Sequence, residues 1–151
     1  MNKILMATDG SRGATEAVEF GLDLAAEQGA APVFVHVAPP LDQIPIGGFA
    51  PIAAVPHELS ETDRRPLEAG EQLAAERGLD AETTLLMGNA ADEIVAYADS
   101  IDADLIVVGS RGHGALASAF LGSVSRGVLH EARRPVLVVR GVTEPAKLVA
   151  H

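Results

Sequence analysis

Short apolar runs alternate with stretches of helical periodicity along this chain, and no other feature of the sequence restricts its fold as much. Between the first two runs, apolar residues recur at the spacing of one helix face, with Ser11 placed to cap the helix and Gly29 to end it. That face comprises Ala14, Ala17, Val18, Gly21, Leu22 and Ala25. The runs themselves are short and rich in branched side chains, which is typical of strands. This first part of the chain is therefore predicted to fold as strand, helix, strand.

The same alternation continues almost to the end of the sequence and predicts a total of five strands and four helices. The strands are expected at residues 3–8, 31–38, 81–87, 104–109 and 135–140. The second helix is acidic and ends near Gly78, and the last two span residues 90 to about 101 and 123–132. Pro66 indicates that the second helix is kinked or starts near that residue. The final run is almost continuously apolar, as expected of a strand buried on both faces.

Alternating strands and helices imply a parallel sheet, because each strand needs a helix to return the chain to the same edge. We expect one doubly wound, Rossmann-like α/β domain over residues 1–141, followed by a C-terminal tail at 142–151. Its five-stranded parallel sheet is expected to have the strand order 3-2-1-4-5, with helices on both faces. Ligands of such sheets lie beyond the carboxyl ends of the strands, where the strand order reverses. A binding site is therefore expected in the loops after Thr8, Val37 and Val108.

Charge and composition exclude several classes of function. The chain has 21 acidic residues against 11 Lys and Arg, so its net charge of −10 repels nucleic acid, and we expect no nucleic-acid partner. Its apolar stretches are far shorter than the roughly 20 residues of a membrane helix, and no signal peptide is evident. The absence of cysteine excludes disulfides and thiolate zinc sites. We expect a soluble, cytoplasmic protein, and the acid excess with few lysines suits a high-salt cytoplasm.

Residues 39–57 do not fit the short connections that are usual in such folds. This segment contains five of the nine prolines and little charge, so it is expected to be a long loop. Three roles are compatible with it: a lid over a ligand, a surface for a partner, or a mobile insertion.

Two glycine-containing segments follow the fourth expected strand and carry the chemistry of the chain. Glycines at 109, 112 and 114 let backbone amides approach an anion and allow positive φ, and a helix that starts near Gly122 offers free N–H groups. Ser123 and Ser125 add hydroxyl groups to that helix start. Arg111 and His113 are candidates for contact with outer phosphates. A tight turn and a helix cap at Ser123 would explain the same residues without any ligand.

The spacing of these glycines distinguishes the segment from other nucleotide-binding loops. No lysine lies near a glycine cluster, which excludes G-x-x-x-x-G-K-[ST], and no G-x-G-x-x-G follows the first strand. The pattern present is G-x2-G-x9-G-[ST], from Gly109 through Gly112 to Gly122 and Ser123. With this motif the chain resembles the universal stress protein family. The resemblance covers nearly the whole chain, through ILMATDGS, VFVHV, LIVVGSRGHG, LGSVS and RRPVLVV.

The resemblance implies that the first, second and fourth strands hold ATP or another adenine nucleotide, with Mg²⁺ carried by its phosphates. It matches Asp9 to an acidic contact with the adenosine, Val37 to the strand residue whose backbone reads the adenine edge, and Val108 to an apolar wall. Asp9 would otherwise cap the first helix or the turn at Gly10, and the two valines are otherwise core residues. The expected binding residues are Ala7, Thr8, Asp9, Val37, Val108, Gly109, Ser110, Arg111, Gly112, His113, Gly122, Ser123, Val124 and Ser125.

The five histidines show no spacing typical of metal ligands, so no protein metal site is expected. His36 is expected to be a hydrogen-bonded residue inside or at the edge of the sheet. Among the histidines, His113 is the candidate for phosphate contact.

Several functions are compatible with this reading. We favour an ATP-binding regulatory protein of the stress response that acts through nucleotide-dependent conformation or partner binding, without obligatory turnover. A slow ATP hydrolase is the enzymatic alternative, but the motif segments supply no lysine and no evident general base. A stress scaffold that binds no nucleotide is another alternative. A phosphoacceptor domain would need an aspartate at the end of the third strand, where Met87 and Gly88 stand.

The final strand suggests how the chain associates. Residues from Val136 to Arg140 would lie at an edge of the sheet, where unpaired backbone groups favour pairing with a second copy. The resemblance also implies a homodimer through this strand. Alternatively, the tail from Gly141 to His151 covers the edge.

Overall fold

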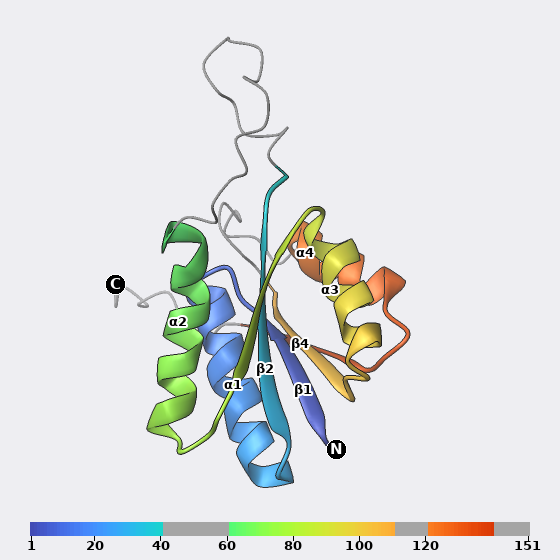
Figure 1. The fold of residues 1–151 in the computed structure, drawn as a ribbon. Helices are drawn as coiled ribbons and strands as arrows, with labels where there is room; N and C mark the ends of the chain where they lie inside the picture. Colours follow the sequence, from blue (N-terminus) through green and yellow to red (C-terminus); the bar gives the residue numbers. More distant parts are fainter. Residues whose placement is uncertain (41–60, 111–120, 141–151) are drawn as a thin grey trace, which may run out of the picture.

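The computed structural model describes residues 1–40, 61–110 and 121–140 of the chain. Its core is one parallel sheet of five strands in the order β3-β2-β1-β4-β5, which confirms the predicted fold class and strand order (Figure 1). The strands are β1 (Lys3–Ala7), β2 (Ala31–Ala38), β3 (Glu82–Met87), β4 (Leu105–Gly109) and β5 (Val136–Val139). Each bound lies within one residue of the prediction.

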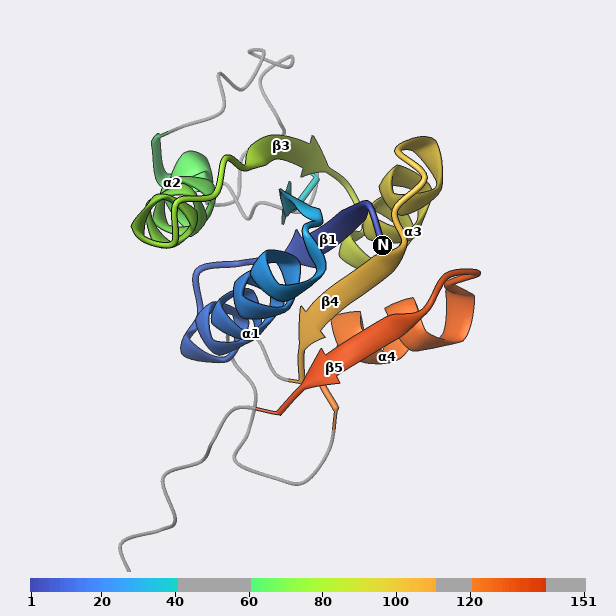
Figure 2. The ribbon, with the colours of Figure 1, turned by 90° about the horizontal axis from the view of Figure 1, so that it is seen from below.

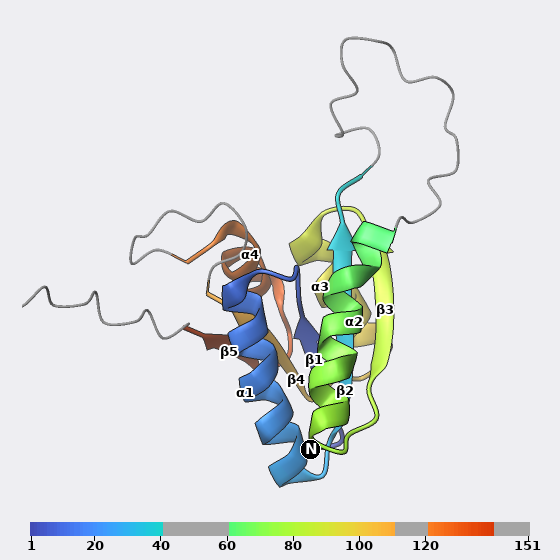
Figure 3. The same ribbon diagram turned by 90° about the vertical axis from the view of Figure 1, so that its left-hand side faces the viewer.

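Two helices cover each face of the sheet. Helices α1 (Arg12–Gln28) and α2 (Glu61–Glu76) pack on one face, and α3 (Ala90–Ser100) and α4 (Ser123–Glu131) pack on the other (Figure 2). Figure 3 shows the first pair from the outside, with β3 and β5 at the two edges of the sheet. Alternate residues of a strand face opposite sides of the sheet. The core residues that pack toward α1 and α2 include Ile4, Met6 and Phe34. Those that pack toward α3 and α4 include Leu5, Val33 and Val35.

The ends and the buried face of α1 follow directly from its sequence. The Ser11 side chain accepts a hydrogen bond from the amide of Ala14, and Gly29 ends the helix in the left-handed region with φ of 65°. The buried residues of the helix are the six expected ones, Ala14, Ala17, Val18, Gly21, Leu22 and Ala25. The predicted cap, stop and face are therefore confirmed.

Two expectations are corrected. Helix α2 begins at Glu61, so of the two alternatives for Pro66 a helix start near that residue is wrong, and Pro66 lies inside the helix. A proline there lacks the N–H that would bond to the carbonyl of Thr62, and its side chain is buried. Strand β5 is not buried on both faces: all four of its residues are half-buried, because the strand lies at the edge of the sheet.

Within the described residues, no helix combines the length and apolar character needed to cross a bilayer. Of the Pro-rich segment 39–57, only Pro39 and Pro40 belong to the described residues. The tail expected at 142–151 also lies outside them.

Helices α3 and α4 approach each other closely at a glycine. A Cβ atom added at Gly127 would lie 2.6 Å from the Cβ atom of Ala91, a contact that neither rigid atom can relieve by rotation. A Cβ atom added at Gly21 would instead meet the sulfur of Met6 at 2.9 Å, which can move because that side chain is flexible.

We therefore expect Gly127→Ala to lower the free energy of unfolding by about 1–2 kcal/mol, since overpacking exceeds the gain in helix propensity. The control Gly21→Ala should change it much less. Urea unfolding followed by circular dichroism measures both values. A Gly127→Ala variant as stable as the wild type would contradict the close packing of α3 on α4.

Candidate functional site

Three apolar residues of the predicted site line the same face of the sheet at its carboxyl edge. Ala7 ends β1, and the neighbouring strands contribute Val37 from β2 and Val108 from β4. All three belong to the layer that packs toward α3 and α4. Ala7 pairs with Val35, and Met6 pairs with Val107, so Val108 lies level with Ala7 and Val37 lies two residues farther along. The structure thus brings together three residues that are far apart in the sequence. We call Ala7, Val37 and Val108 the apolar wall.

The turn between β1 and α1 is fixed by its own side chains. Thr8 is buried, and its amide donates to the carbonyl of Val35 over 2.9 Å. Its Oγ1 atom accepts from the amide of Gly10 at 3.2 Å, and Oδ1 of half-buried Asp9 accepts from the amide of Ser11 at 2.9 Å. Asp9 therefore has the turn role that was its alternative assignment, whereas the cap of α1 is Ser11.

His36 connects this turn to β2, a contact that the sequence did not reveal. Its Nδ1 atom lies 2.8 Å from the carbonyl oxygen of Thr8, the residue directly after the neighbouring strand β1. The predicted hydrogen-bonded role of His36 is confirmed, but its partner could not be inferred from spacing. The available signal was a polar ring in an otherwise apolar strand.

Gly109, at the end of β4, is required by packing rather than by a special backbone angle. A Cβ atom at this position would lie 2.8 Å from the carbonyl oxygen of Gly13, in the first turn of α1. The glycines with positive φ among the described residues are Gly10, Gly29, Gly78 and Gly88. Gly109 therefore does not use the positive φ that a glycine allows. Gly112 and Gly114 lie outside the described residues.

The carbonyl oxygen of Ser110 links β4 to α4. It accepts from the amide of Gly122 at 2.7 Å and from Oγ of Ser125 at 3.3 Å. The hydroxyl of Ser125 is buried and also lies 3.0 Å from the carbonyl oxygen of Gly122. These bonds to Ser110 therefore hold the end of β4 next to the start of α4. Arg111, Gly112 and His113 belong to that segment and lie outside the described residues.

The start of α4 provides backbone amides that no carbonyl of the helix can bind. Gly122 occupies the cap position with φ of −65°, so Ser123 is the first helical residue rather than the cap. The first intrahelical bond runs from the amide of Arg126 to the carbonyl of Gly122, which leaves the amides of Ser123, Val124 and Ser125 without helical acceptors. Ser123 and Val124 are exposed. These amides and the helix dipole favour a bound anion.

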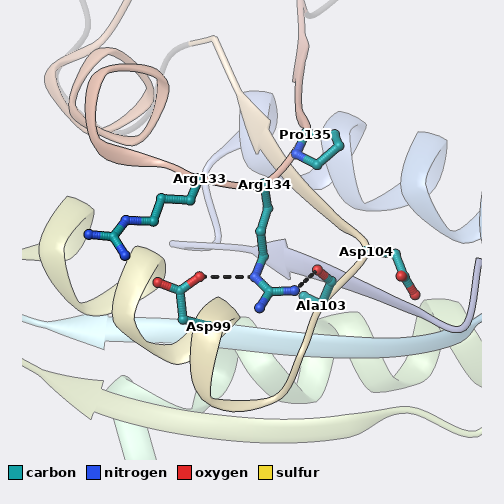
Figure 4. Close-up of a pocket in the computed structure, with 6 residues that line it drawn as sticks. All are labelled: Asp99, Ala103, Asp104, Arg133, Arg134 and Pro135. Atoms are coloured by element: carbon teal, nitrogen blue, oxygen red, sulfur yellow. Dashed lines mark hydrogen bonds and ion pairs between the residues drawn. The ribbon is translucent and has the colours of Figure 1, made fainter.

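A cleft at the opposite, amino edge of the sheet has about 560 Å³ of space, and its residue Arg134 is already engaged in hydrogen bonds (Figure 4). Nε of Arg134 bonds Oδ1 of Asp99 at 2.9 Å, and its terminal nitrogens reach Ala103 O at 2.7 Å and Asp102 Oδ1 at 3.2 Å. The bonds to Asp99, first, and to Asp102 raise the pKa of Arg134. The bonds of Arg134 therefore hold the end of α3 to the connection between α4 and β5, which is a structural role.

Asp104 holds the amino terminus of the chain at the same edge. One carboxylate oxygen accepts from the amides of Asn2 at 2.7 Å and Lys3 at 2.9 Å. These hydrogen bonds, that from Lys3 first, lower the pKa of Asp104 below its ordinary value of 3.8. Within the described residues, no three potential metal-ligating side chains gather at one place.

Comparison with known proteins gives one consistent result. A family model described as the universal stress protein family matches residues 1–140. The universal stress protein YxiE of Bacillus subtilis is 36% identical over 147 residues, which cover 92% of this chain and 99% of that protein. The universal stress protein MJ0531 of Methanocaldococcus jannaschii is 34% identical, with 91% and 81% covered.

Solved structures agree with the sequence matches. A universal stress protein in complex with cAMP superposes with a TM-score of 0.69 and 26% identity, covering 91% of this chain and 96% of that chain. The universal stress protein of Archaeoglobus fulgidus in complex with dAMP gives the same TM-score of 0.69, identity of 26% and coverage of 91% and 96%.

The contacts of Asp104 predict how the stability of the fold depends on pH. A lowered pKa in the folded state contributes stability above the unfolded pKa, and this contribution is lost as the pH falls through the folded pKa. Asp104→Asn should therefore be less stable than the wild type at pH 7, and the difference should shrink below about pH 4. Urea midpoints measured from pH 3 to 7 test this, with exposed Asp80→Asn as the control. A difference that is constant across this range would refute the role of the Asp104 charge.

Proposed function

Because this chain belongs to the universal stress protein family, we propose that it binds ATP or another adenine nucleotide at the carboxyl edge of its sheet. One observation carries the proposal: the apolar wall and the amides at the start of α4 that have no helical acceptor lie along the same edge. An adenine ring needs an apolar surface and a polyphosphate needs amide donors, so the two halves of such a ligand find their partners there. Relatives in complex with cAMP and dAMP support an adenine nucleotide as the ligand.

The adenosine half of the ligand packs against the apolar wall in this proposal. The backbone at Val37 reads the adenine edge, and Asp9 contacts the adenosine through its carboxylate, together with Thr8 at the end of β1. Ala7 leaves room because its side chain is small. Asp9 keeps Oδ1 on the amide of Ser11, so its carboxylate is already oriented by the turn.

The phosphates bind the amides of Ser123, Val124 and Ser125, beside Gly122, and the segment from Gly109 to His113. The amide of Gly122 itself donates to the carbonyl of Ser110. The hydroxyl of exposed Ser123 is available for the same ligand, whereas that of Ser125 is directed at the carbonyls of Ser110 and Gly122. Mg²⁺ would enter with the phosphates and neutralise part of their charge.

The protein acts as a regulator in this proposal, and hydrolysis of ATP is not required. Of its two lysines, Lys3 lies at the amino edge of the sheet, where Nζ donates to the carbonyl of Ile101 at 3.3 Å. It is thus remote from the phosphate end, and the carboxylate of Asp9 is engaged by the turn. We place this activity in the cytoplasm and in the domain of residues 1–141.

Calorimetric titration of the purified protein with ATP and Mg²⁺, and separately with AMP and cAMP, tests the site. Gly122→Val should weaken binding at least tenfold, because its side chain would occupy the place of a phosphate. The φ of −65° at Gly122 is open to any residue, so the substitution acts through bulk and not through backbone strain.

Ala96→Val, on the exposed side of α3, is the matched control and should bind as the wild type does. If no nucleotide binds the wild type, the site proposal fails and a stress scaffold without nucleotide becomes the better account. Release of phosphate from bound ATP, measured at the same time, would instead favour the slow hydrolase.

We further propose that β5 pairs with β5 of a second copy to form a homodimer. Among the described strands, β5 pairs with β4 alone, and its four apolar residues are half-buried. The carbonyls of Pro135 and Val139 accept bonds from β4, so the alternating residues Val136 and Val138 direct their backbone groups to the open edge. Half-exposed apolar side chains and free backbone groups together favour a partner strand.

Val138→Pro removes one outward N–H group and leaves the bonds to β4 intact, so it should convert the dimer to a monomer. Val138→Thr keeps both the N–H group and the shape, and should remain dimeric. Light scattering coupled to size exclusion gives the mass of each. A dimeric Val138→Pro protein, or a monomeric wild type at high concentration, would exclude association through this strand.

A further inference from the structure

We infer that His36 is a positioning residue of the nucleotide site: its imidazole holds the carbonyl of Thr8 and thereby orients the peptide that carries Asp9. This inference rests on the proposed function. His36 is half-buried in β2, one residue before Val37, and its Nδ1 lies 2.8 Å from the carbonyl oxygen of Thr8. One side chain therefore joins the ends of two of the three strands that border the proposed site.

The chemistry of the contact fixes the state of the ring. A backbone carbonyl can only accept a hydrogen bond, so Nδ1 of His36 must carry the proton. In the neutral ring this leaves Nε2 as the unprotonated nitrogen. The other neutral tautomer, with its proton on Nε2, would set a lone pair against the oxygen of Thr8 and lose the bond.

The bond completes a set of contacts that leaves Thr8 little freedom. Its amide donates to Val35, its hydroxyl accepts from Gly10, and its carbonyl accepts from His36. That carbonyl belongs to the same planar peptide unit as the N–H group of Asp9. Holding the oxygen therefore sets the direction in which the chain leaves β1 at Asp9. With its position already set, the carboxylate of Asp9 can contact a ligand without the entropy cost of being ordered on binding.

His36 acts from behind the apolar wall rather than within it. Successive residues of a strand face opposite sides, and Val35 and Val37 belong to the layer of α3 and α4. His36 lies between them and so faces the side of α1 and α2. Its replacement leaves the side chains of the wall in place, and any loss of affinity then reports on the turn.

Two substitutions separate the hydrogen bond from the rest of the side chain. His36→Asn keeps an N–H donor near the position of Nδ1 and should bind the nucleotide within about twofold of the wild type. His36→Gln extends its amide to the position of Nε2, and His36→Leu has no donor. Both should raise Kd by about five- to tenfold, the size expected for one lost hydrogen bond.

Thr84→Val is the matched control. Thr84 is also half-buried in the same sheet, but it lies on β3. The substitution removes the 2.7 Å hydrogen bond between Oγ1 of Thr84 and the hydroxyl of Tyr97. It should leave nucleotide affinity unchanged. Nitrogen-15 NMR of the imidazole should show the proton of neutral His36 on Nδ1.

Each outcome bears on a separate claim. If the wild type binds no adenine nucleotide, the proposed function fails before His36 is tested. If the wild type binds and His36→Gln and His36→Leu bind equally well, the nucleotide site stands and the positioning role is overturned. A ring protonated on Nε2 overturns it as well. If His36→Leu does not fold, the pair of His36→Asn and His36→Gln and the ring tautomer still decide.

Discussion

Parallel pairing of β1 with β2 on one side and β4 on the other is the constraint on which the rest of the structure depends. It brings the ends of three strands to one edge, and each following segment must begin there. The edge is then held by hydrogen bonds to backbone carbonyls. His36 bonds the carbonyl of Thr8, while Gly122 and Ser125 share that of Ser110. These contacts fix the turns around the site without using the amides of Ser123, Val124 and Ser125.

Features set by neighbours in the sequence could be predicted, because their physical causes are local. Ser11 caps α1 with its own hydroxyl, Gly29 ends it in a conformation that favours glycine, and the buried face follows from the helical period. The strand order follows from the handedness of crossovers and from the resemblance to a family. The bond from His36 to Thr8 spans 28 residues of sequence and ends on a backbone carbonyl, which every residue possesses. No pattern of side chains could reveal it.

Gly109 illustrates why a motif can be recognised correctly and explained incompletely. The motif suggests that a ligand approaches the backbone of this glycine, yet the atom that approaches it in the folded chain is the carbonyl oxygen of Gly13. The sequence cannot tell whether a ligand or a helix needs the space, since both exclude a side chain. Pro66 and β5 differed from expectation for a related reason. A proline can be buried within a helix, and an apolar strand can lie at an edge, when neighbouring elements supply the packing.

The close approach of Gly127 to Ala91 has a mechanical consequence. With no room for a side chain between the two helices at this point, α4 cannot move toward α3 unless α3 moves with it. The last turn of α3 is also held by the ion pair from Asp99 to Arg134, which lies in the connection between α4 and β5. The helix α3 is therefore tied both to α4 and to the connection that follows it.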